Sequence, residues 1–113
     1  MEDAFLRMGW IKYVLIDVRE PSEVVQGRIP TATNIPLKDI ATAFQLGDKD
    51  FMVRYGIPKP TAGEDVVFYC RSGKRSSSAV EAVEKLGLNL NLRNYRGSWL
   101  DYSANALKDQ TLL

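Results

Sequence analysis

Residues 66–76 have the sequence Val-Val-Phe-Tyr-Cys-Arg-Ser-Gly-Lys-Arg-Ser. The first four form a continuous apolar run, which is typical of a strand covered on both faces. The last seven hold one glycine and three cations, and between residues 79 and 86 apolar side chains recur at helical spacing. This order of buried strand, polar loop and helix predicts an α/β fold with Cys70 at the tip of a central strand.

The loop after Cys70 has the makings of an anion-binding cradle. Gly73 allows a left-handed turn, so that backbone N–H groups converge on one point, and the following helix adds its unpaired N–H groups and dipole. Positive surroundings favour a thiolate, so we expect Cys70 to be a nucleophile. Two plainer interpretations stay open: a lone cysteine after an apolar strand is often a buried small hydrophobe, and the cations can belong to a solvated loop.

The rest of the chain alternates short β-like runs with helical patterns, which indicates a mainly parallel sheet flanked by helices. We expect a single domain over residues 1–113. A second central strand is predicted at 13–16, with weaker strand candidates at 34–35 and 91–94. Helices are predicted over 37–44 and 50–55, after N-cap serines at 76–78, and from Ser98 or Leu100 onward.

The composition narrows the possible functions. Fifteen basic residues oppose fourteen acidic ones, and the net charge of +1 gives no broad footprint for nucleic acid or a membrane surface. The sequence holds one cysteine and no histidine. These counts argue against an internal disulfide, a structural zinc site and any Ser-His or Cys-His triad. We therefore expect no metal site. The acidic N-terminus resembles neither a secretory signal nor a transit peptide.

Four segments, in order along the chain, resemble the signatures of rhodaneses. Residues 70–76 resemble the Cys-x-x-Gly-x-Arg-Ser active-site loop, and residues 17–20 (DVRE) the family's Asp-Val-Arg segment. Residues 27–36 (GRIPTATNIP) match a Gly-x-Ile-Pro-Gly-Ala-x-Asn-Ile-Pro signature, with Thr31 where glycine is usual. Residues 95–99 resemble a C-terminal Gly-Gly-x-x-x-Trp block, with Arg96 for the first glycine and a shorter spacing to Trp99. The chain is most similar to small thiosulfate sulfurtransferases related to the insect heat-shock rhodanese.

The resemblance implies a rhodanese-like fold and a sulfurtransferase without a cofactor. Sulfane sulfur would pass from thiosulfate, or a related small anionic donor, to cyanide or a thiol such as glutathione or thioredoxin, through a persulfide on Cys70. Asp17 and Arg19 would support the loops beside the site. Small relatives of this kind are mitochondrial or cytoplasmic. The expected substrate-binding residues are the six that follow the cysteine: Arg71, Ser72, Gly73, Lys74, Arg75 and Ser76.

Two other functions remain open at this point. A phosphatase or arsenate reductase of the same fold needs five residues between cysteine and arginine, whereas four separate Cys70 from Arg75. A non-catalytic rhodanese module for protein binding commonly lacks the cysteine or the charges of the loop, and this chain has both.

The N-terminal stretch departs from the family pattern. The family usually begins with a short strand and then a helix, and residues 1–12 have room for a helix over 2–8 but hardly for both. We therefore expect a missing edge strand, and either a shortened sheet in a monomer or a weak homodimer formed through that edge.

Overall fold

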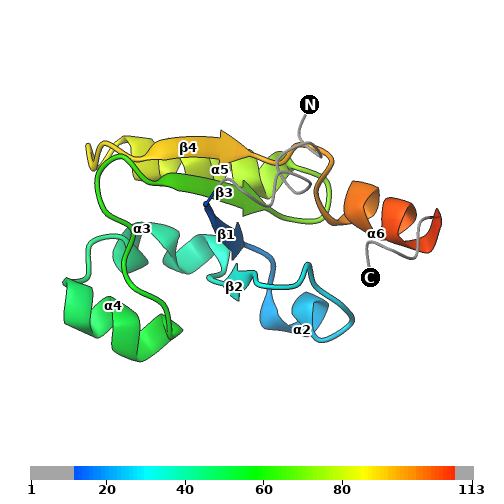
Figure 1. The fold of residues 1–113 in the computed structure, drawn as a ribbon, viewed down its shortest axis with the longest axis horizontal. Helices are drawn as coiled ribbons and strands as arrows, with labels where there is room; N and C mark the ends of the chain where they lie inside the picture. The colour runs from blue at the N-terminus through cyan, green and yellow to red at the C-terminus, as the bar shows by residue number, and fades with distance from the viewer. Residues whose placement is uncertain (1–11, 109–113) are drawn as a thin grey trace.

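The structure, a computed structural model, describes residues 12–108. It has a mixed α/β architecture, with short helices between the strands of one sheet (Figure 1). The strands are β1 (Val14–Asp17), β2 (Thr33–Asn34), β3 (Asp65–Tyr69) and β4 (Asn91–Asn94). The helices are α2 (Pro21–Val24), α3 (Ile40–Ala43), α4 (Asp48–Tyr55), α5 (Lys74–Glu84), α6 (Ser98–Lys108) and the 3₁₀ helix η1 (Leu37–Asp39).

The sheet is parallel throughout, in the order β2-β1-β3-β4. β1 and β3 are its two central strands, with Val14 opposite Val66 and Asp17 opposite Tyr69. The chain leaves β1 toward one edge of the sheet, where β2 lies, and leaves β3 toward the opposite edge, where β4 lies. The carboxyl ends of these two strands therefore meet at a topological switch point, the usual place of a ligand site in such sheets.

The central strands are buried on both faces, as their continuous apolar runs predict. Ile16, Val66 and Phe68 pack with residues of α3, α4 and α5 in one apolar cluster. Successive side chains alternate across the sheet, and Leu15, Val67 and Tyr69 therefore join a second cluster on the opposite face, where α6 contributes Trp99 and Tyr102. In Figure 1, α2 and α6 lie at the end of the sheet toward which the strand arrows point.

The predicted strands and most of the predicted helices are confirmed. The two weak strand candidates become β2 and β4, and the expected helix over 37–44 is divided into η1 and α3. The helix expected to begin after residues 76–78 instead starts at Lys74 with Gly73 as its N-cap, because the left-handed turn at Gly73 aims the chain into the helix directly. The predicted helix over 2–8 and the missing edge strand lie outside the described residues.

α2 was not predicted from the sequence. It is a single turn that starts with Pro21 at its first position, and Glu20 and Glu23 form a capping box around it. Between residues 12 and 108, no helix is both long and apolar enough to cross a bilayer.

Candidate functional site

The backbone at the tip of β3 is fixed by the start of α6. The N–H of Cys70 donates to Oγ of Ser98 at 3.1 Å, and its carbonyl accepts from the N–H of Trp99 at 2.9 Å. Ser98 has a left-handed backbone with φ of 52°, and its hydroxyl donates to the carbonyl of Tyr95 at 2.7 Å. The cysteine is thereby held beside the first turn of α5, with 1% of its surface exposed.

Gly73 turns the loop back toward the sulfur. Its φ of 97° lies in the left-handed region, as predicted, and its N–H donates to Sγ of Cys70 at 3.0 Å. A side chain here would also collide with the backbone carbonyl of Arg96. The position therefore requires glycine both for its backbone angle and for its close approach to the chain before α6.

Hydrogen bonds, more than cationic side chains, lower the pKa of the Cys70 thiol. Burial raises the pKa of Cys70, but the hydrogen bonds that its thiolate can accept, from the Ser76 hydroxyl and from the N–H groups of Ser76, Gly73 and Ser72, outweigh it, and the pKa falls below its ordinary value. The thiol is thus buried, as expected if Cys70 were only a small hydrophobic residue of the core, but it also accepts a hydrogen bond from the N–H of Gly73. The sulfur sits in the cradle that the loop sequence predicts.

The three cations of the loop have different surroundings. Arg71 and Lys74 are exposed. Arg75 is half-buried and donates two hydrogen bonds to the Glu23 carboxylate on α2, at 2.7 and 2.9 Å. The bond from Arg75 is the main cause that lowers the pKa of Glu23 to about 2. One of the three expected donor-binding charges is therefore already paired within the fold.

Asp17 and Arg19 form a buried ion pair at the end of β1. Nε of Arg19 donates to Oδ1 of Asp17 at 3.0 Å and Nη2 to Oδ2 at 2.7 Å, while Nη2 also bonds the carbonyl of Gly27 at 2.8 Å. The guanidinium lies 4.9 Å from the ring centre of Trp99, which stacks on Tyr102. This network joins the segment after β1, the turn before β2 and α6.

Three side chains at the site were missed by the sequence analysis: Glu23, Asn94 and Ser98. The capping box and the proline at the start of α2 were local signals that could have placed Glu23 on a helix. Asn94 ends a weak strand and Ser98 begins a helix, and neither carries a motif that points to the sulfur.

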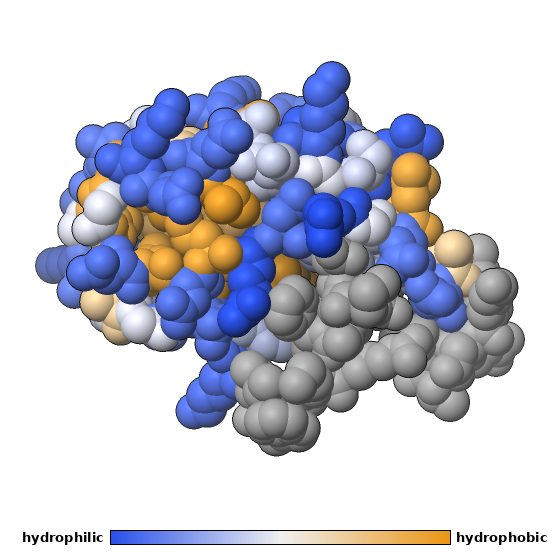
Figure 2. All heavy atoms as spheres, turned by 90° about the horizontal axis from the view of Figure 1, so that it is seen from above, coloured by the Kyte–Doolittle hydropathy of each residue, from blue (hydrophilic) through white to orange (hydrophobic). Residues whose placement is uncertain are grey.

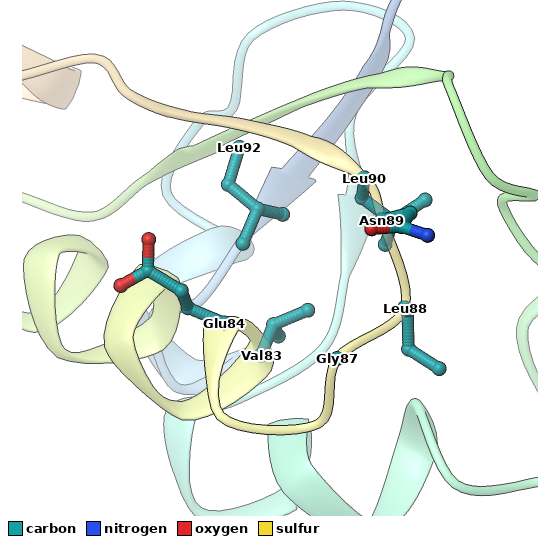
Figure 3. A pocket seen from close by; sticks show the side chains of 7 residues that line it. All are labelled: Val83, Glu84, Gly87, Leu88, Asn89, Leu90 and Leu92. Atoms are coloured by element: carbon teal, nitrogen blue, oxygen red, sulfur yellow. The ribbon is translucent and has the colours of Figure 1, made fainter.

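A hollow of about 230 Å³ lies at the opposite end of α5 from the cysteine, lined by Val83, Glu84, Gly87, Leu88, Asn89, Leu90 and Leu92. Leu92 extends from β4 toward the end of α5 that carries Val83 and Glu84 (Figure 3). Figure 2 shows apolar side chains gathered over this part of α5 and β4, among polar ones. No residue that lines the hollow belongs to the predicted site.

Comparison with known proteins agrees with this geometry. A Schizosaccharomyces pombe protein, provisionally named as a mitochondrial thiosulfate sulfurtransferase, is 50% identical over 90 residues, which cover 80% of this chain and 63% of the relative. The thiosulfate:glutathione sulfurtransferase of Saccharomyces cerevisiae is 40% identical over 89 residues, 79% of this chain and 63% of that one. The chain thus spans a little under two thirds of the length of these relatives.

The fold comparison leads to the same family. The human single-domain sulfurtransferase TSTD1 superposes with a TM-score of 0.81 at 32% identity, over 90% of this chain and 88% of the human one. The sequence model of the rhodanese-like domain family matches residues 2–105, nearly the whole sequence. The loop with Cys70 at the tip of β3, the relatives and the family match all agree, and the chain belongs to the rhodanese-like domain family.

Proposed function

We propose that the chain is a thiosulfate sulfurtransferase in which Cys70 carries the transferred sulfur as a persulfide. The observation that carries this proposal is the Sγ of Cys70 lying 3.0 Å from the N–H of Gly73, beside the start of α5. An N–H group that points at the sulfur stabilises both the thiolate and the persulfide anion formed from it. The names of the yeast and human relatives support the same reaction.

The reaction has two half-steps that balance without a cofactor. The thiolate of Cys70 attacks the outer sulfur of thiosulfate; a bond forms between the two sulfurs, the bond to the sulfonate sulfur breaks, and sulfite leaves with the electron pair. An acceptor nucleophile then attacks the terminal sulfur of the persulfide, and Sγ departs as the thiolate. Sulfite is a stable anion, and hence no general acid is needed.

The surrounding residues would have distinct roles. The N–H groups of Ser72, Gly73 and Ser76 would hold the sulfur anion, and the exposed cations of Arg71 and Lys74 would attract the sulfonate of the donor. The buried pair of Asp17 and Arg19 would keep the neighbouring loops in place. Arg75, bound to Glu23, would act mainly within the loop.

Mass spectrometry of the intact chain tests the proposal. After incubation with thiosulfate, the wild type should gain the mass of one sulfur atom and lose it on addition of cyanide, while Cys70→Ser should gain none. Ser78→Ala, which removes an exposed serine of α5, serves as the control and should behave as the wild type. Sulfur gained by Cys70→Ser, or a wild type that stays unmodified, would refute Cys70 as the sulfur carrier.

The acceptor and the compartment follow from the relatives as further proposals. Glutathione is the acceptor named for the yeast and human relatives, and we propose the same thiol here rather than thioredoxin. Sulfite release with glutathione, thioredoxin or cyanide as acceptor separates these cases. Two yeast relatives are named mitochondrial, which supports a mitochondrial over a cytoplasmic site of action. Imaging of the tagged full-length protein tests this assignment.

One observation favours a second function, a non-catalytic rhodanese module. The cysteine is 1% exposed and belongs to the apolar cluster that includes residues of α3, α4 and α5. A donor can reach the sulfur only if the loop admits it. A wild type that is never persulfurated, by thiosulfate or by a polysulfide, would support this second function.

A further inference from the structure

The hydroxyl of Ser76 lies between two groups that compete for its proton. Its Oγ is 3.5 Å from Sγ of Cys70 and 2.6 Å from Oδ1 of Asn94. Ser76 is fully buried, at the first turn of α5, while Asn94 is the last residue of β4. A serine hydroxyl has a single proton to donate and can serve one of these two acceptors at a time.

The orientation of the Asn94 amide is fixed by a third group. Its Nδ2 donates to the carbonyl of Gly73 at 3.1 Å, and a carbonyl accepts hydrogen bonds but cannot donate them. The reversed amide would place two oxygens against each other there. Oδ1 must therefore face Ser76, and it too is only an acceptor, so the short contact of 2.6 Å holds the Ser76 proton.

The hydrogen bond between Sγ and the Ser76 hydroxyl therefore has a different donor in each charge state of the sulfur. When Cys70 is a thiol, its S–H can donate to Oγ of Ser76 while Ser76 donates to Asn94, and all three groups are satisfied. When Cys70 is a thiolate, the proton of Ser76 stabilises it only by turning away from Asn94, which leaves Oδ1 of Asn94 without that donor.

We propose that Asn94 is a positioning residue that holds the Ser76 hydroxyl in the arrangement suited to an uncharged Sγ and gives up the proton when Sγ becomes an anion. This inference rests on the proposed persulfide chemistry. In the persulfide, the negative charge lies on the outer sulfur and Sγ is uncharged. The Ser76 proton then returns to Asn94, and Asn94 thereby favours the loaded chain over the free thiolate.

Removing Asn94 and Ser76 separately and together isolates this competition. The chain has one cysteine, so thiolate absorbance in the ultraviolet, followed against pH with Cys70→Ser as the blank, reports Cys70 alone. Neither alanine substitution alters a charged side chain. The charged residues on the elements around the sulfur therefore stay the same, among them Asp17, Arg19, Glu23, Lys38, Asp39, Arg71, Lys74, Arg75 and Asp101.

Asn94→Ala should lower the thiol pKa by roughly half a unit to one unit, because the Ser76 proton becomes free for the sulfur. Ser76→Ala should raise the pKa, and adding Asn94→Ala to it should change nothing further. Mere damage to the loop would remove N–H groups from the sulfur and raise the pKa, so the direction distinguishes the two causes. Ser78→Ala controls for loss of a serine from α5.

Should Asn94→Ala fail to fold, Asn94→Leu keeps a side chain of similar size while it removes the acceptor at Ser76. It too should lower the thiol pKa, and it should change nothing further in the Ser76→Ala background, where there is no hydroxyl proton to release. Additive shifts in either pair of variants, or a rise with Asn94→Ala, would overturn the role of Asn94. None of these measurements uses thiosulfate, so their outcome is independent of whether Cys70 is persulfurated.

Discussion

The carboxylate of Glu23 and the guanidinium of Arg75 form a two-bond ion pair that joins α2 to the first turn of α5. Paired hydrogen bonds of this kind fix the orientation of both groups. The contact links the segment that follows β1 to the loop that follows β3, across the switch point of the sheet. It also neutralises one of the cations that the loop sequence predicts for binding an anionic donor.

Releasing Arg75 should strengthen donor binding. Glu23→Gln removes the negative charge and leaves Arg75 as a third available cation near the sulfur, and we expect the KM for thiosulfate to fall by roughly three- to tenfold with kcat little changed. Steady-state release of sulfite measures both constants. Glu81→Gln removes an equal charge from an exposed position on α5 and should leave KM nearly unaltered. A raised KM in Glu23→Gln would show that Arg75 must be tethered for donor binding.

The same pair gives the fold a specific dependence on acid. Arg75 lowers the pKa of Glu23 from its usual value near 4.5 to about 2 in the folded chain, so the pair stabilises the fold fully above about 4.5. That contribution, about 1 kcal/mol at a site this accessible to solvent, is lost as the pH falls through about 2. Urea unfolding of wild type and Glu23→Gln should differ near neutral pH and converge at the acid end. A difference that persists below pH ~2 would contradict this cause.

The sequence predicted the parts of the site that are local in the chain. The apolar run before Cys70 and the left-handed turn at Gly73 depend on neighbouring residues, and the structure has both. The partners that shape the loop come from far away: Arg75 meets Glu23 across 52 residues, Cys70 meets Ser98 across 28, and Ser76 meets Asn94 across 18. No spacing rule links such pairs, since their contact is created by the order of the strands.

This distinction also explains the misplaced start of α5. Serines at 76–78 are good N-cap residues, and propensity alone starts the helix after them. In the structure the helix begins two residues before Ser76, because Gly73 takes the cap position and the buried Ser76 side chain is used at the sulfur instead. The contact of Ser76 with the sulfur thus takes precedence over the local preference of serine for the N-cap.

Gly73→Ala should disrupt both the fold and the thiol. The new Cβ meets a left-handed backbone and the carbonyl of Arg96, and no flexible side chain is there to yield. We expect a loss of at least 2 kcal/mol in the free energy of unfolding, a higher pKa for Cys70 and little sulfur uptake from thiosulfate.

Gly63→Ala is the matched control, since Gly63 also has a positive φ, of 88°, but open space around its Cβ position. It should cost about 1 kcal/mol from backbone strain alone and leave the thiol pKa unchanged. Equal losses in the two variants would mean that the close approach to Arg96 contributes nothing.

Thr31 gives the opposite case, a side chain where the backbone favours glycine. It is exposed, its φ is 72°, and it stands where the rhodanese signature usually has glycine. A β-branched residue is strained in this conformation, while glycine is not, although glycine costs some additional chain entropy. We expect Thr31→Gly to raise the free energy of unfolding by about 0.5 to 1 kcal/mol, measured by urea unfolding. Thr42→Gly makes the same chemical change at an exposed position of α3, where the backbone is helical, and it should destabilise the fold. If both substitutions destabilise the chain equally, the positive φ of Thr31 carries no strain that glycine can relieve.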